Sequence, residues 1–372
     1  MIERSLDPRS LLVGWVLASA CATAGRAPDT TEHGLPVVQM EEVRIQTAPD
    51  PLTGLDTYDA GDLLELGNRL FDGRDFDRAL KVYEHLISVF PGSSLAPTAL
   101  YNSGLCFENL AEFDQALGRF QQVINDYSSA STAKDAHYRS ALCLSKLGRW
   151  QEVADRFWEV RQQENLSTME ELEARVGLGV AMFMLDDYAT AEREFMSAIR
   201  FYEEKSKAEY LPAQYWTGQS RFYLGEIFAR YMERVELKSE AREGEAWKKD
   251  MAAKLEEKCD LLLRAQNNFV RTIREGHTGW ATAAGFRIGS MYEHLYDAMV
   301  SLPKPPDVSD TAEPFYAEAL KDRIGVLVDK AIQVYERSLE MAQRVGEKNE
   351  WVERTARALE RMKTLALAAI RG

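Results

Sequence analysis

Cysteine and histidine are the side chains with which this sequence could most readily bind a metal, attack a substrate or carry a proton. The four cysteines form no Cys-x-x-Cys pair, and the five histidines form no His-Glu-x-x-His segment. The pair Asp186-Asp187 falls where a turn is expected, and aspartates there commonly cap helices. These residues indicate neither a metal site nor a catalytic centre. We therefore expect no cofactor and no enzyme activity.

Charge and composition indicate which class of partner the chain can have. Of its 372 residues, 45% are hydrophobic and 28% are charged, and the formal net charge is −14. An acidic surface repels phosphate groups, which argues against nucleic-acid binding. The abundance of Ala, Leu, Glu and Arg favours helices. The composition therefore predicts a helical protein whose partners are other proteins.

The N-terminus carries an apolar run, residues 11–20, that ends at Cys21. The run is about half the ~20 residues that span a bilayer, but its length suits a secretion signal. The segment Leu17-Ala18-Ser19-Ala20-Cys21 resembles a bacterial lipobox, in which the cysteine is lipidated. The resemblance implies a lipoprotein-type signal peptide at residues 1–20 and a lipid anchor on Cys21. An ordinary signal peptide cut near Ala20 is the alternative.

Residues 21–57 read as a flexible tether behind this anchor, because they are rich in Thr, Pro, Asp, Gly and Glu and show no sustained period. The residue after the cysteine is Ala22 rather than Asp. By resemblance to the sorting rule of Gram-negative bacteria, this implies attachment to the outer membrane on its periplasmic face.

A pattern of small and aromatic residues recurs from about residue 60 at intervals of 37 or 38 residues. Each small residue is followed by an aromatic residue further along the same unit. The small residues are Gly67, Gly104, Ala141 and Gly179, and the aromatics are Tyr83, Phe120, Phe157 and Phe195. This pattern resembles the tetratricopeptide repeat (TPR), a helix–turn–helix that buries its apolar face only by stacking on its neighbours. It predicts four regular TPR units at residues 58–208.

The pattern continues in a stretched form beyond residue 208. Gly225 has its matching aromatic, Phe269, much later, and Gly289 has Tyr335. We therefore expect two extended TPR-like units at residues 209–348. Their insertions are a charged, solvated helical extension at about 232–257 and a proline-rich loop at 303–307. A capping helix at residues 349–372 would complete an all-α, right-handed superhelical solenoid.

Several stretches of sequence resemble known envelope proteins. The segment Ala-Leu-Tyr-Asn-Ser-Gly at 99–104 resembles the outer-membrane TPR lipoprotein of the β-barrel-assembly machinery. Residues 222–227 and 281–289, with Trp351, resemble TPR lipoproteins of deltaproteobacteria, including the adventurous gliding motility TPR lipoprotein of myxobacteria. The resemblance covers about residues 60–365. It implies a non-catalytic scaffold that organises a protein complex at the periplasmic face of the outer membrane.

Two alternatives remain open at the level of sequence. One is an accessory factor for outer-membrane protein assembly or for coordination of the cell wall and envelope. The other, from a different class, is an enzyme or a carbohydrate-binding module built on a helical solenoid.

Some TPR domains bind the C-terminal carboxylate of a partner through Lys, Asn, Asn, Lys and Arg on successive helices. In this chain Asn68, Asn102 and Arg139 take three of those places, but Leu64 and Asp135 take the places of the lysines. The acid at the second lysine place argues against such a clamp, so a general partner groove is the simpler hypothesis. Its candidate residues are Asn68, Tyr101, Asn102, Leu105 and Arg139. Partners are also expected at the C-terminal insertions.

Overall fold

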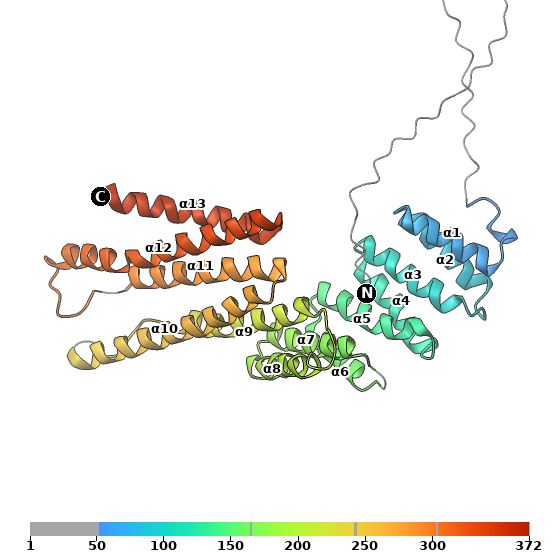
Figure 1. The fold of residues 1–372 in the computed structure, drawn as a ribbon, viewed down its shortest axis with the longest axis horizontal. Helices are drawn as coiled ribbons and strands as arrows, with labels where there is room; N and C mark the ends of the chain where they lie inside the picture. The colour runs from blue at the N-terminus through green and yellow to red at the C-terminus, as the bar shows by residue number, and fades with distance from the viewer. Residues whose placement is uncertain (1–51, 164–165, 242–243, 303, 372) are drawn as a thin grey trace, which may run out of the picture. The chain divides into compact units, whose positions relative to one another are not determined.

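The computed structural model describes residues 52–163, 166–241, 244–302 and 304–371. The predicted signal peptide, Cys21 and most of the predicted tether lie outside these residues. Within them the chain forms a short 3-10 turn, Leu55–Thr57, and thirteen α-helices (Figure 1). The helices are α1 (Ala60–Asp72), α2 (Phe76–Val89), α3 (Ala96–Asn109), α4 (Phe113–Asp126), α5 (Ser131–Lys146), α6 (Trp150–Arg161), α7 (Thr168–Met184), α8 (Tyr188–Lys205), α9 (Gln214–Arg234), α10 (Gly244–Arg274), α11 (Thr278–Val300), α12 (Glu313–Val345) and α13 (Glu350–Arg371).

Consecutive helices pack as pairs, from α1 with α2 to α11 with α12, and each pair also contacts the next pair along the chain. The last helix, α13, packs on both α11 and α12, which themselves lie side by side (Figure 1). Each pair thus buries its apolar faces on its own partner and on its neighbours, as repeat proteins do. The predicted all-α repeat fold is confirmed.

A glycine on the first helix of a pair lies against an aromatic ring on the second helix. A Cβ atom at Gly104 would stand 2.7 Å from the ring of Phe120, and one at Gly179 would stand 2.7 Å from the ring of Phe195. Real Cβ atoms do not approach so closely, so only glycine permits this separation of the two helices. The third unit differs, because the ring of Phe157 on α6 lies against Gly177 of α7, in the following pair.

The extended units contain the same contact. The ring of Phe269 on α10 covers Gly225 of α9, and the ring of Tyr335 on α12 covers Gly289 of α11. In both cases the second helix is much longer than in the regular units and extends before the contact. The added residues therefore lengthen the helices and loops without displacing the contact.

The turn between the two helices of each regular unit contains one residue in the left-handed region. These residues are Arg74, Ala111, Gly148 and Asp186, with φ of 60°, 61°, 71° and 61°. In the first unit the neighbouring Gly73 has φ −74°, so the conformation favoured by glycine falls on Arg74 instead. Only the third unit places a glycine at this position.

The charged extension expected as one helix at about 232–257 is interrupted. Helix α9 ends at Arg234, residue Val235 takes an extended conformation, and α10 begins at Gly244. Most of the charged side chains that the structure describes in this stretch are exposed, as expected, although Leu237 and Met251 are buried. In the described part of the chain, no helix is both long enough and apolar enough to cross a membrane.

Candidate partner-binding face

Two asparagines of the predicted groove come together between α1 and α3. Asn102 Nδ2 donates a hydrogen bond to Asn68 Oδ1 at 3.0 Å, and the Tyr83 hydroxyl donates to the same oxygen at 2.7 Å. Tyr83 is fully buried, and this burial raises its pKa well above the ordinary value, so the hydroxyl stays protonated. The amide of Asn68 is therefore held in place by a buried donor, while its residue faces solvent.

Arg139 on α5 belongs to a second group of contacts. Its Nη1 donates to Glu108 Oε1 on α3 at 2.9 Å, and its guanidinium also interacts with Tyr101. Glu108 is mostly buried, with 16% of its side chain exposed. Because this carboxylate already neutralises Arg139, a partner carboxylate would have to compete with Glu108. A carboxylate clamp, against which the acid at Asp135 already argued, would therefore lack a free cation at Arg139.

The remaining predicted residues form the apolar part of the same face. Tyr101 and Leu105 are half-buried and pack against the core formed by α3, α4 and α5. The rings of Tyr101 and Phe120 lie 5.5 Å apart. We call the surface formed by Asn68, Tyr101, Asn102, Leu105 and Arg139 the first-helix face. It offers amide donors, one tyrosine and one paired arginine to a partner.

Sequence reasoning missed two residues that organise this face, Tyr83 and Glu108. The sequence predicts only a packing role for the aromatic ring of Tyr83. The other regular units have phenylalanine at this position, so the additional hydroxyl group could have indicated a polar role. Glu108 carried no signal of its own in the sequence. Its role follows from the contact between α3 and α5, which brings together residues from successive repeats.

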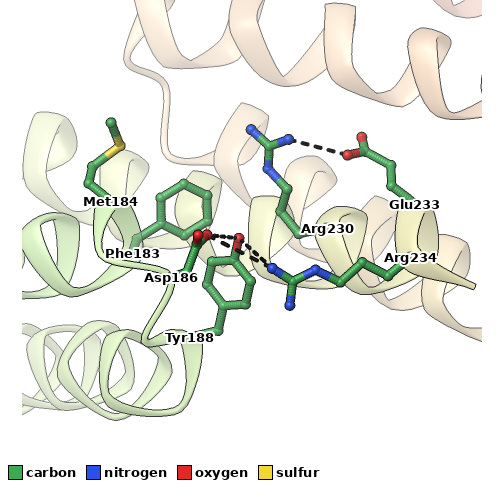
Figure 2. Close-up of a pocket in the computed structure, with 7 residues that line it drawn as sticks. All are labelled: Phe183, Met184, Asp186, Tyr188, Arg230, Glu233 and Arg234. Atoms are coloured by element: carbon green, nitrogen blue, oxygen red, sulfur yellow. Dashed lines mark hydrogen bonds and ion pairs between the residues drawn. The ribbon is translucent and has the colours of Figure 1, made fainter.

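An open pocket of about 470 Å³ lies away from the first-helix face, where α7, α8 and α9 meet. Phe183 and Tyr188 lie between Met184 on one side and Arg230 on the other (Figure 2). Arg234 lies over the ring of Tyr188 at 4.9 Å. Asp186 and Glu233 complete the lining. The pocket thus combines apolar rings with two arginines.

The charges of this pocket are largely paired within the chain. Arg230 Nη1 lies 3.3 Å from Glu233 Oε2, and Arg234 Nη2 lies 3.9 Å from Asp186 Oδ1 (Figure 2). The Tyr188 hydroxyl also donates to Asp186. The pocket therefore carries no excess of either charge, and its arginines are arranged for structure as much as for a ligand. Among the described residues, no group of three or more His, Cys, Asp or Glu side chains could hold a metal ion.

Comparisons with known proteins identify the repeats. Two tetratricopeptide-repeat family models match the chain, at residues 64–110 and 98–130, which together run from within α1 to just beyond α4. No curated protein sequence matches the chain. The first two helix pairs are therefore tetratricopeptide repeats, which are modules for protein–protein interaction.

Several solved structures of repeat proteins are similar to parts of this chain. MamA from Desulfovibrio magneticus RS-1 is 15% identical, with 56% of this chain and 96% of that chain covered and a TM-score of 0.36. YrrB, described as a TPR protein with an unusual peptide-binding site, is 17% identical, with 56% and 91% covered and a TM-score of 0.35. The C-terminal part of a TPR protein from Cytophaga hutchinsonii is 12% identical, with 83% and 98% covered and a TM-score of 0.43.

Proposed function

We propose that this chain is a non-catalytic scaffold that holds other proteins together at the periplasmic face of the outer membrane, anchored through Cys21. One observation supports the scaffold most strongly. The same glycine–aromatic contact holds together the two helices of regular and extended units, as in Gly104 with Phe120 and Gly225 with Phe269. Each pair also packs on the next pair along the chain, and stacked arrays of this kind bind proteins along an extended surface.

The first-helix face is the proposed binding surface for one partner. Asn102 and Asn68 are preoriented by their mutual hydrogen bond and by the Tyr83 hydroxyl, so little side-chain entropy would be lost on binding. Their remaining amide groups can bond to the backbone of an extended segment or to polar side chains of a helix. Tyr101 and Leu105 would supply apolar contact beside them.

This surface can be tested with matched double variants. Asn102→Ala with Arg139→Ala removes an amide and a guanidinium from the face, and partner capture from crosslinked native envelopes should fall strongly. The control is Gln122→Ala with Asn125→Ala, because both residues are exposed on the second helix α4. Equal capture by the two double variants and the unaltered chain would exclude the first-helix face as the site.

The lipid anchor rests on the lipobox-like segment and needs its own test. Intact-mass analysis of the mature protein should give a diacylated or triacylated N-terminal Cys21, and Cys21→Ser should release the protein from the membrane fraction. A mature N-terminus at any other, unmodified residue would remove the anchor from the proposal but leave the scaffold intact.

Gliding motility machinery is the complex we propose first, because the extended units resemble TPR lipoproteins that include the myxobacterial gliding protein. Assembly of outer-membrane proteins is the second candidate, supported by residues 99–104. Mass spectrometry of crosslinked partners distinguishes them. Recovery of envelope motility components supports the first, and recovery of β-barrel-assembly components supports the second.

A further inference from the structure

Lys258 on α10 is a lysine buried inside the extended units, with only 2% of its surface exposed. Its Nζ donates to the carbonyl oxygens of Met232 at 2.7 Å and Val235 at 3.0 Å, at the C-terminal end of α9. The last carbonyls of a helix lack partners within the helix, and a cation is stabilised there by the helix dipole. Lys258 of α10 therefore caps the C-terminal end of α9.

The third hydrogen of the ammonium group points to His294 of α11. Lys258 Nζ lies 3.3 Å from His294 Nε2. An ammonium group has three donors and no acceptor, so Nε2 must act as the acceptor and the imidazole must be neutral, with its proton on Nδ1. Two carbonyls and one imidazole nitrogen thus satisfy all three donors of a buried charge.

Four charged groups act on His294. Lys258 comes from α10, Glu233 from α9, and Arg287 and Asp297 from α11 itself. Glu233 is engaged elsewhere, because its Oε1 accepts from Arg287 Nη2 at 3.2 Å and its Oε2 lies 3.3 Å from Arg230 Nη1. Glu233 is therefore already paired with two arginines and is not free to neutralise a protonated imidazole.

We propose that Lys258 and His294 form an acid-sensitive latch, in which protonation of His294 breaks the contact with Lys258 and loosens the junction of α9, α10 and α11. A proton on Nε2 turns the only nitrogen acceptor into a donor and places two positive charges beside each other. Lys258 then loses one of its three partners. The residues released are the end of α9, the segment 235–241 and the start of α10.

The direction of the pH dependence follows from the surroundings of the imidazole. Burial, and then the charge of Lys258, hold the pKa of His294 below its ordinary value of 6.5. The unfolded chain therefore binds this proton more readily than the folded chain. Stability from the latch is complete above pH 6.5 and is lost as the pH falls through the folded-state pKa.

Hydrogen–deuterium exchange of the full chain tests the latch directly. Protection factors, corrected for the intrinsic pH dependence of exchange, are compared at about pH 7.5 and about pH 5. Amides at the end of α9 and the start of α10 should lose protection at the lower pH, by up to about thirtyfold, because pH 5 lies about 1.5 units below the ordinary pKa of 6.5. The protection factors of the amides of α1 to α4 should not change between the two pH values.

Two variants show whether His294 is responsible. His294→Gln keeps an acceptor, Oε1, for Lys258 but cannot take up a proton, so protection of the latch segments should be the same at both pH values. His85→Gln is the matched control, because His85 is a half-buried histidine on α2, in the first unit. It should leave the loss of protection unchanged. An equal loss in His294→Gln, or no loss in the unaltered chain, would overturn the proposal.

Discussion

Gly225 lies so close to Phe269 that a methyl group on its Cα would stand 2.7 Å from the ring, the same separation as between Gly104 and Phe120. One pair belongs to an extended unit and the other to a regular unit. The long insertion between Gly225 and Phe269 therefore leaves the geometry of the repeat unchanged. The requirement for glycine comes from the ring that covers it, not from the length of the chain between them.

Substitution of this glycine should destabilise the extended units. Gly225→Ala forces the added Cβ into the buried ring of Phe269, and overpacking of this kind costs about 1–3 kcal/mol. The free energy of unfolding, measured by urea denaturation, should fall by this amount. Gly118→Ala is the control, because a Cβ there meets no atom within 4 Å and alanine favours the helix. Equal stability of the two variants would contradict the proposed close contact.

Two substitutions at the left-handed turn residues should have opposite effects on stability. Gly148→Ala should lower stability by about 1 kcal/mol, because alanine resists φ of +71° although there is space for its side chain. Ala111→Gly should raise stability by roughly 0.5–1 kcal/mol, because it relieves the same strain at φ 61° and outweighs the entropy cost of glycine. Thermal unfolding midpoints that shift in the same direction would contradict this explanation.

How much of this fold the sequence reveals depends on whether a signal is local or long-range. Gly67, Gly104 and Gly179 recur with their aromatics at constant spacing, so the regular units could be predicted. The same logic located Gly225 with Phe269, because the types of residue persisted when the spacing did not. The break after Arg234 could not be predicted, since the charged segment has strong helix formers and the extended Val235 is fixed by tertiary packing.

The candidate site could likewise be predicted from the sequence only where the signal is local. Asn68, Tyr101 and Asn102 could be placed on one face from their positions in the repeat. The pairing of Arg139 with Glu108 could not, because it depends on which rotamers two half-buried side chains adopt across successive repeats. Lys258 is a further case. Beside a run of alternating charges it resembles a solvated lysine, yet the C-terminal end of α9 and His294 of α11 enclose it.

Cys106 and Cys143 should be unreactive in the folded chain. Both are free, both are fully buried, and burial raises the pKa of each thiol to about 12. Alkylation at about pH 8 should therefore label neither residue until denaturant is added. Peptide mapping of the labelled sites checks this, and labelling of either cysteine without denaturant would contradict it.

The same thiols predict a dependence of stability on alkaline pH. Their folded pKa values of about 12 lie above the ordinary value of 9.0, so the folded chain holds these protons more tightly than the unfolded chain. The stability they contribute is complete below pH 9 and is lost as the pH rises toward 12. A variant with Cys106→Ala and Cys143→Ala should lose less stability between about pH 8 and about pH 10 than the unaltered chain. Stability is measured by urea denaturation. If the variant and the unaltered chain lose the same stability between the two pH values, the thiols make no such contribution.

The ion pairs of Arg287 in the extended units should behave as one coupled group. Arg287 donates to both Glu226 and Glu233, and only 16% of the Arg287 side chain and 11% of the Glu226 side chain are exposed. Arg287→Met leaves the Glu226 carboxylate buried without its main partner, which should cost about 3–5 kcal/mol of stability. Adding Glu226→Leu removes that uncompensated charge, so the double variant should be more stable than Arg287→Met alone. The other carboxylate, Glu233, is not left unpaired in these variants, because Arg230 can still pair with it.

Urea denaturation of the two single variants and the double variant completes the cycle for Arg287 and Glu226. Strictly additive losses would mean that the two side chains act independently, and the network would then have no part in fixing α11 against α9.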